Sequence, residues 1–310
     1  MLDYGVGIGI GLLAVLDSRD AKIQESAMSK QSAMFQNSTD EPVMTFRILL
    51  SLVFILAFQV STHAESKTKI LLIGKKPDHP FGSHMYMHTS GVLAECLKQT
   101  KGVETVVSQG WPEDPKLLEG VKTIVVYSSP AAEFLLDGPG SGELDKMMKN
   151  GVGLVTIHWA SSVNQKNLDR IGDRWISYLG GTWVSNVGLS TSKSQLKQLA
   201  PKHPICRGWD EYELHDEYYL NPTISDAATP MLEVTTKGQK VIVGWAYERP
   251  GNGRAYGTTL GHYYSNFQNT AFRRTIVNAI LWTAHVEVPK DGAPVELTEK
   301  QLALPPKPGK

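Results

Sequence analysis

The sequence predicts an α/β domain built on a parallel sheet with helices on both faces. Three short apolar runs in its first half each fit a strand buried on both faces, namely KTKILLIG, VKTIVVYS and GLVTIH. Helical segments lie between the runs, and such alternation is typical of a parallel sheet. The 310 residues are enough for one large domain.

The first half supplies these elements in a regular order. Its expected strands lie at 67–74, 104–109, 121–128 and 153–158, and its expected helices at 91–99, 142–149 and 168–179. Lysines near the end of the second helix precede Asn150-Gly151, and the third helix runs into Gly180-Gly181, which are both stop signals. A polar loop follows the first strand.

The second half is less regular. Its expected elements are strand and turn at 182–197, a long polar and aromatic connection at 201–221, and strands at 231–235, 241–248 and 254–260. Phe272, Ile276 and Ile280 lie on one stripe of a packing helix at 271–284. Beyond it, proline and lysine dominate the tail at 287–310, and its end, LPPKPGK at 304–310, is expected to be disordered.

The composition argues against a nucleic-acid partner. Basic residues and acidic residues both number 31, so the formal net charge is zero, whereas a nucleic-acid binder usually has a basic surface. The two cysteines, Cys96 and Cys206, lack the spacing of a structural zinc site. Cys96 lies on an apolar stripe, which favours a buried thiol. A disulfide to Cys206 is the alternative if the protein is exported.

The first 64 residues are expected to precede the folded domain, which we place at 65–286. The segment at 44–64 combines Arg47, an apolar run and a small-residue site ending at Ala64, which is typical of a signal peptide. The run is shorter than the ~20 residues that span a bilayer, so no stable membrane span is expected after cleavage; an uncleaved anchor is the alternative. Export to the periplasm or outside the cell follows. Residues 1–43 are expected to be a disordered, non-native extension.

Several histidines follow expected strands. Ligands of parallel sheets bind beyond the carboxyl ends of the strands. His79 and His84 lie in the loop after the first strand, His158 ends the fourth strand, and His262 follows Leu260-Gly261. Imidazole suits both proton transfer near neutral pH and metal binding. For His79 a turn-forming role before a proline is the alternative, and His88 in the same loop is expected to be solvated.

Other polar and aromatic residues add to this candidate site. Asp216 and Glu217 are adjacent carboxylates, and neighbours on an extended segment point to opposite faces, so one of them is expected to face the site. Arg254 is expected to orient a polar ligand, with a surface ion pair as the alternative. Trp159 offers a flat face of the kind on which sugars stack.

Six short motifs follow one another between residues 151 and 282, within a segment at 67–284 that resembles one protein family. In order they are GVGLVTIH at 151–158, HPICRG at 203–208, DEYY at 216–219, GNGR at 251–254, YGTTLGH at 256–262 and AILW at 279–282. Their order and spacing resemble the ThuA-like family of trehalose utilisation. Family members often have an acidic residue after the LGH histidine. This chain has Tyr263 there, which we count among the substrate-binding residues.

The resemblance implies a fold similar to the type 1 glutamine amidotransferases: a flavodoxin-like three-layer sandwich with a mostly parallel central sheet, in a single domain. Those enzymes carry a cysteine nucleophile after a strand, and His158 takes the comparable place here. Amidotransferase activity is therefore not expected. The family is linked to the breakdown of trehalose and related disaccharides, through 3-keto sugars.

The favoured hypothesis is an exported enzyme of carbohydrate catabolism, a lyase, hydrolase or isomerase acting on disaccharides, glycosides or their 3-keto forms. Its expected catalytic residues are His158, His262 and Glu217. Its expected substrate-binding residues are His79, His84, Trp159, Asp216, Arg254 and Tyr263. A divalent metal held by the histidines and carboxylates stays open, and no other cofactor is expected. The alternatives are a sugar-binding module without turnover and an interaction domain on a retained fold.

Overall fold

The computed structural model describes residues 67–185 and 187–307. The expected extension at 1–43 and the expected signal peptide at 44–64 lie outside the described residues. Within those two ranges, no helix is long and apolar enough to cross a bilayer.

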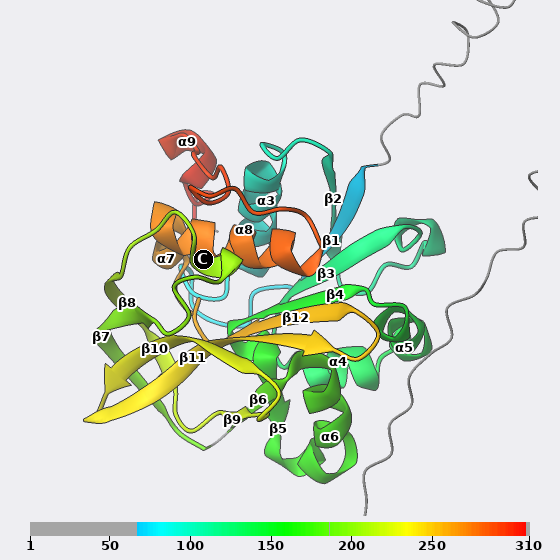
Figure 1. The fold of residues 1–310 in the computed structure, drawn as a ribbon, viewed down its shortest axis with the longest axis horizontal. Coiled ribbons are helices and arrows are strands. Elements are labelled where there is room, and N and C mark those ends of the chain that lie inside the picture. The colour runs from blue at the N-terminus through cyan, green and yellow to red at the C-terminus, as the bar shows by residue number, and fades with distance from the viewer. Residues whose placement is uncertain (1–66, 186, 308–310) are drawn as a thin grey trace, which may run out of the picture. The chain divides into compact units, whose positions relative to one another are not determined.

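A large sheet runs through the domain, and in the described chain it has nine strands in the order β2-β1-β3-β4-β12-β11-β10-β7-β8 (Figure 1). These are β1 (Thr68–Gly74), β2 (Val103–Gln109), β3 (Val121–Tyr127), β4 (Gly153–Ile157), β7 (Leu189–Gln198), β8 (Tyr212–Tyr219), β10 (Thr229–Thr236), β11 (Gln239–Arg249) and β12 (Gly253–Thr258). A small second sheet joins β5 (Ser162–Asn164), β6 (Gly181–Ser185) and β9 (Thr223–Ile224).

The large sheet is mixed, so the expectation of a mostly parallel sheet fails in the second half of the chain. From β2 to β12 each neighbouring pair is parallel, whereas β11, β10, β7 and β8 pair antiparallel. The strands from β10 to β12 follow one another without a crossover helix, and strands joined by short turns can pair only in antiparallel fashion. The expected connection at 201–221 contains β8, which joins the end of the sheet.

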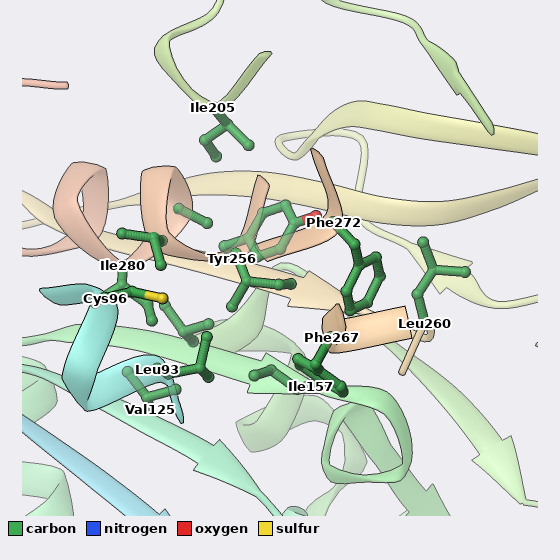
Figure 2. Close-up of a cluster of buried hydrophobic side chains, with 14 of the residues drawn as sticks. Leu93, Cys96, Val125, Ile157, Ile205, Tyr256, Leu260, Phe267, Phe272 and Ile280 are labelled. Atoms are coloured by element: carbon green, nitrogen blue, oxygen red, sulfur yellow. The ribbon is translucent and has the colours of Figure 1, made fainter. Parts of the chain in front are cut away.

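Helices cover both faces of the parallel half. On one face lie α3 (Tyr86–Leu97) and α8 (Thr270–Thr283), and on the other α4 (Ala131–Leu136), α5 (Ser141–Lys149) and α6 (Leu168–Leu179). Ile70 and Leu72 of β1 belong to the core on the α3 and α8 side, part of which Figure 2 shows. Leu71 and Ile73 belong to the opposite core. Burial on both faces explains why the strands read as continuous apolar runs.

The C-terminal segment at 287–307, which lies beyond the boundary expected for the domain at residue 286, packs on the domain. Three of its side chains are buried, namely Val288, Ala293 and Val295. Arg273 of α8 donates to the carbonyl of Val295 at 3.2 and 3.3 Å. A capping box then starts α9 (Glu299–Leu302). The few apolar residues follow neither a helix nor a strand period, so composition alone misses them.

The two cysteines are buried free thiols. The buried thiol expected at Cys96 is confirmed, and the alternative disulfide to Cys206 is wrong. Burial raises the pKa of the Cys96 thiol to about 11 and that of Cys206 to about 12. Both are therefore protonated near neutral pH, the unreactive form.

Candidate metal centre

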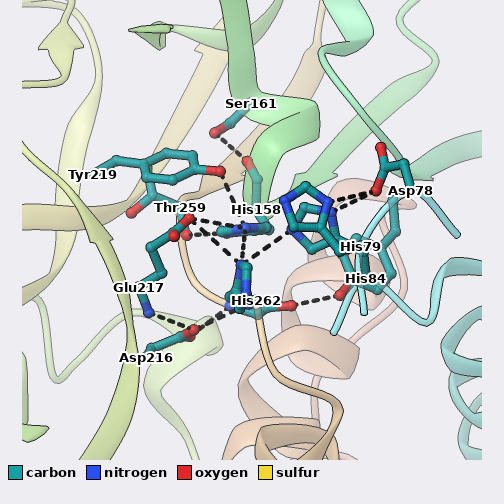
Figure 3. Close-up of polar contacts among 12 residues, drawn as sticks. Asp78, His79, His84, His158, Ser161, Asp216, Glu217, Tyr219, Thr259 and His262 are labelled. Carbon is teal, nitrogen blue, oxygen red and sulfur yellow. Dashed lines mark hydrogen bonds and ion pairs between the residues drawn. The ribbon is translucent and has the colours of Figure 1, made fainter. Parts of the chain in front are cut away.

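Three histidines meet at the carboxyl end of the parallel half, each from the chain that follows a different strand (Figure 3). His84 lies in the loop after β1, His158 follows β4 directly, and His262 comes shortly after β12. All three are buried. The rule that ligand sites lie beyond the carboxyl ends of parallel strands therefore places them correctly.

His158 is held by its backbone and by a carbonyl group. Its φ is 58°, in the left-handed region that residues with a Cβ atom seldom adopt, and such strain clusters at functional sites. Nδ1 donates to the carbonyl of Thr259 at 2.8 Å. Because a carbonyl only accepts, this bond assigns the proton to Nδ1 and leaves a lone pair on Nε2.

His84 is oriented in the same way by a carboxylate. Its Nδ1 lies 2.7 Å from Oδ1 of Asp78, and the Tyr86 hydroxyl donates to the same oxygen at 3.1 Å. His79 also bonds this carboxylate through Nδ1, at 2.9 Å. Partial burial raises the pKa of Asp78, but the hydrogen bonds from His79, His84 and Tyr86 outweigh it and hold that pKa below its usual value. An ionised Asp78 leaves the lone pair of His84 on Nε2.

The lone pairs of His84 and His158 converge on His262. Nδ1 of His262 lies 3.1 Å from Nε2 of His84 and 3.2 Å from Nε2 of His158. Burial lowers the pKa of His84 to about 4, although Asp78 opposes the shift. Burial and the nearby imidazoles lower the pKa of His158 well below its usual range. Both rings are therefore neutral near pH 7, which is the metal-binding form.

The three nitrogens fit a divalent cation. His84, His158 and His262 each offer a nitrogen, and these atoms lie within 4.8 Å of one another. Zinc binds imidazole nitrogen at about 2.0–2.1 Å in tetrahedral geometry, which places ligand nitrogens about 3.3 Å apart. Hydrogen bonds from the Tyr219 hydroxyl and from Nδ1 of His262 are an alternative that also accounts for the short distances. A single cation, however, binds the lone pairs of all three nitrogens at once. The Nδ1 atoms of His84 and His158 are bonded to the Asp78 carboxylate and the Thr259 carbonyl. Carboxylates and backbone carbonyls in this position are what orient metal-binding histidines in proteins. We call these three residues the histidine triad.

A carboxylate and a hydroxyl group from β8 border the histidine triad. Oε2 of Glu217 lies 3.5 Å from Nδ1 of His262 and 3.8 Å from Nε2 of His158. The hydroxyl of Tyr219 lies 3.1 Å from Nε2 of His158. Glu217 and Tyr219 are two residues apart on a strand and share a face. Glu217 is thus placed to bind a cation or to exchange a proton with a molecule beside it.

Asp216 is a positioning residue, and the expectation that it contacts substrate is wrong. It is fully buried, and its carboxylate accepts from the backbone N–H groups of Gly261 at 2.6 Å, Glu217 at 2.9 Å and His262 at 3.0 Å. Burial raises the pKa of Asp216 to about 6, although these three bonds oppose the shift. Of the two adjacent carboxylates, only Glu217 faces the open side of the site, as the alternation of a strand predicts.

A cavity of about 190 Å³ opens beside the histidine triad. The residues that line it include His79, His84, Trp159, Trp183, Glu217 and Tyr219. Four of the expected site residues therefore meet at one cavity. His158 and His262 lie behind this wall, within reach of Glu217 and Tyr219.

Arg254 does not reach this site. It lies at the amino end of β12, where its Nη1 donates to the carbonyl of Trp282 at 3.1 Å and its guanidinium stacks on the Trp282 ring at 4.9 Å. Its Nε lies 3.5 Å from Oε1 of Glu248. The ligand-orienting role expected for Arg254 is wrong, and the ion-pair alternative describes it.

Tyr263 and His88 also differ from expectation. The Tyr263 ring meets the edge of His262 with centroids 4.5 Å apart and stacks on His215 at 5.1 Å, but it is not among the residues that line the cavity. His88 lies within α3, packed 4.8 Å from the ring of Tyr264, so it is not a solvated loop residue. Burial lowers the pKa of His88.

Sequence reasoning missed Asp78, Tyr219, Thr259 and Trp183. Two of them left a signal. Asp78 directly precedes His79 in the loop after the first strand, and Tyr219 stands two positions after Glu217 in a segment that alternates. Thr259 acts through its carbonyl oxygen, so its side-chain type carries no information about this role.

The family model for ThuA, described as trehalose utilisation, matches residues 69–283. The chain belongs to the ThuA family. The match contains all three residues of the histidine triad, together with Asp78 and Glu217. No curated protein matches this ThuA-family chain.

Three solved structures are similar to this ThuA-family chain. A protein of Bacteroides uniformis described as thua-like is 14% identical, over 74% of this chain and 95% of that chain, with a TM-score of 0.54. This likeness supports the fold. A protein of Thermoplasma acidophilum described as a gmp synthase subunit a is 16% identical, over 71% and 95%, with a TM-score of 0.44. A glutamine amidotransferase of Thermotoga maritima is 12% identical, over 62% and 75%, with a TM-score of 0.41.

Proposed function

We propose that this ThuA-family chain is an enzyme of carbohydrate breakdown that acts on keto-disaccharides and keto-glycosides at a divalent-metal centre. The observation that carries the proposal is the convergence of three imidazole rings: Nδ1 of His262 lies 3.1 Å from Nε2 of His84 and 3.2 Å from Nε2 of His158. The Nδ1 atoms of His84 and His158 are already bonded to acceptors. Membership of a family linked to trehalose utilisation supplies the substrate class.

Glu217 is the proton acceptor in this proposal. In a 3-keto glycoside one carbon lies between the ketone and the anomeric carbon, and the ketone acidifies its C–H bond. Glu217 takes this proton, and the electron pair moves toward the ketone oxygen. The pair then forms a double bond to the anomeric carbon, and the bond to the glycosidic oxygen breaks. The products are an unsaturated keto sugar and an alcohol, so no oxidant is needed.

The histidine triad has a holding role, which revises the acid–base role expected for His158 and His262. Both are buried, and the pKa of His158 lies well below its usual range because of burial. A divalent ion held there would supply positive charge close to the ketone oxygen. His79 is more exposed, lines the cavity and is oriented by Asp78, so we assign it the delivery of a proton to the departing oxygen.

The experiment is to incubate the purified protein with 3-ketotrehalose and with trehalose, with and without a chelator. We expect glucose to be released from 3-ketotrehalose but not from trehalose, and we expect the chelator to abolish the release. An unsaturated partner product indicates elimination, and 3-keto-glucose indicates hydrolysis. Saturable binding of the keto sugar without product would instead identify a binding module. Full activity after metal removal would refute the metal centre.

The proposal includes export, on the basis of the pattern at 44–64. Expression of the whole chain followed by N-terminal sequencing of the exported protein tests it. We expect a mature terminus directly after Ala64. Retention of the protein in the cytoplasm would contradict export without affecting the proposed chemistry.

A further inference from the structure

The cavity beside the histidine triad is small for the proposed substrates. Its volume is about 190 Å³. Pockets that bury drug-sized ligands have about 300–1,000 Å³. A disaccharide has two rings of similar size, so the cavity has room for one of them and not for both.

Two walls of the cavity are aromatic and fixed. Trp183 stacks on Tyr219 with ring centroids 4.0 Å apart and an interplanar angle of 21°. The Trp183 Nε1–H donates to the carbonyl of Leu220 at 3.0 Å, which fixes the ring on which Tyr219 stacks. Both rings are almost fully buried. A buried, stacked ring pair that borders a cavity makes a preformed apolar surface.

Trp159 forms a third aromatic wall. It follows His158 directly, and its ring lies 5.8 Å from that of His79 and 5.9 Å from that of His84. It is only partly buried, so part of the ring is open to a bound molecule. The C–H faces of a pyranose are apolar and match such flat surfaces, whereas its hydroxyl groups lie around the edge.

Titratable groups line the cavity around the histidine triad. Glu217 and His79 line it together with His84 of the histidine triad, and both lie close to His262. Figure 3 shows Glu217 on one side of His158 and His262, and His79 and His84 on the other. Elsewhere the cavity reaches Leu189, which is 43% exposed to solvent. A ring held among the aromatic walls therefore presents its edge to Glu217, and whatever is attached to that ring extends outward.

We infer that this cavity is a subsite for a single keto-pyranose ring, so that the enzyme recognises the ring it attacks and leaves the departing group in solvent. The inference rests on the proposed function and narrows its substrate class to terminal 3-keto-glycosyl units on varied alcohols. Trp159 is the specificity-determining residue of this subsite. Recognition of both rings of a disaccharide is the arrangement that this inference excludes.

The test compares three 3-keto-α-glucosides that differ only in the departing group: methanol, 4-nitrophenol or glucose, the last being 3-ketotrehalose. We expect their KM values to agree within about threefold. Trp159→Ala should raise all three KM values by about tenfold or more, and Trp159→Phe should restore most of the loss because it keeps a flat ring. Trp111→Ala is the control, since Trp111 lines a separate cavity that shares no residue with this one.

Two results would overturn the subsite. One is a KM for 3-ketotrehalose more than about tenfold below that of the methyl glucoside, which would mean that the second ring is bound. The other is an unchanged KM in Trp159→Ala. If no compound is turned over, the proposed function fails, and calorimetric dissociation constants for the same three compounds decide about the subsite by the same criteria. Absence of binding by all three would also overturn it.

Discussion

Nδ1 of His262 lies 3.2 Å from Nε2 of His158, although the two residues are 104 positions apart in the chain. The sheet explains the contact. β4 and β12 are parallel neighbours in which Ile157 pairs with Thr258. The residues that follow these strands, His158 and Thr259, therefore leave the sheet at the same level, where Nδ1 of His158 reaches the carbonyl of Thr259. The turn through Gly261 then brings His262 back over His158.

This arrangement leads to a first prediction about metal content. His84→Ala, His158→Ala and His262→Ala should each lose a bound divalent ion, with affinity reduced by at least about 100-fold. Asp78→Asn should cost about 10–100-fold, because Asp78 orients a ligand without binding the ion. Elemental analysis of purified variants and competition with a chelating dye measure this.

His215→Gln is the matched control, since His215 is exposed and stacks on Tyr263. It should keep the metal content of the unmodified protein. Equal metal content in all variants, or none in the unmodified protein, would argue that protons rather than a cation connect the histidine triad.

The second prediction concerns pH. An imidazole must be neutral to bind metal, and in the unfolded chain this requires a pH above about 6.5. In the folded protein burial lowers the pKa of His84 to about 4 and lowers that of His158 well below its usual range. Metal binding at pH 5–6 therefore displaces no proton from these two rings.

We accordingly expect the logarithm of the metal affinity to fall by about one or less per pH unit between pH 6 and 5. Three imidazoles with ordinary pKa values would give a slope of about three. Chelator competition at fixed ionic strength measures the slope. A slope near three would show that the rings are solvated and that the buried geometry is wrong.

The third prediction separates proton transfer from metal binding. Glu217→Gln keeps the size of the side chain but removes the base, so kcat for 3-ketotrehalose should fall by about 10²–10⁴-fold. Its metal content should stay unchanged, because the histidine triad holds the ion. Loss of the metal in Glu217→Gln would instead make Glu217 a ligand, and unchanged kcat would remove it from the chemistry.

The parallel half of the sheet and the position of the site could be read from the sequence for a physical reason. Strands buried on both faces must be apolar throughout, so the runs around Leu71 and Val125 stand out. Polar residues directly after such runs, such as His158, have no place in the core. They therefore mark the carboxyl edge of the sheet, where His84 and His262 also lie.

The features that could not be predicted from the sequence depend on contacts between segments that are distant in the chain. β8 was hidden because Leu214, Asp216 and Tyr218 alternate on its buried face, and the central one is a carboxylate. Its burial is tolerable only because three backbone N–H groups, among them that of Gly261, neutralise it. The prediction for Arg254 failed for the opposite reason. Its motif suggests contact with a ligand, but Arg254 lies at the amino end of β12, whereas the site lies beyond the carboxyl end.

The fourth prediction concerns Asp216. Burial raises the pKa of Asp216 to about 6, so between about pH 4 and 6 the folded protein holds a proton that the unfolded chain has lost. The contribution of this group to stability is therefore complete below about pH 4 and declines as the pH rises through 6. Asp216→Asn cannot accept at both oxygen positions and should lower the free energy of unfolding by about 1–3 kcal/mol.

Because the asparagine does not titrate, the loss in Asp216→Asn should be larger at pH 4 than at pH 7. Urea unfolding at both pH values, followed by tryptophan fluorescence, measures the difference. Asp210→Asn, at an exposed position, should show neither the loss nor its pH dependence. A loss that grows toward pH 7 would mean that Asp216 is ionised throughout.

The last prediction concerns the C-terminal segment at 287–307 and uses a pair of glycines. Gly208 and Gly238 have positive φ values of 73° and 75°, so alanine strains both backbones by a similar amount, about 1 kcal/mol. They differ in their surroundings. A Cβ atom on Gly208 would lie 1.9 Å from the carbonyl oxygen of Asp291, whereas one on Gly238 would meet nothing within 4 Å.

Gly208→Ala must therefore displace the chain around Asp291, which uncovers Val295 and takes its carbonyl away from the buried Arg273. Loss of an acceptor for a buried charged group adds about 1–3 kcal/mol to the backbone strain. We expect Gly208→Ala to unfold at clearly lower urea than Gly238→Ala, and limited proteolysis to cut it first within 287–307. Equal urea midpoints and equal cleavage patterns would show that this segment contributes little to the stability of the domain.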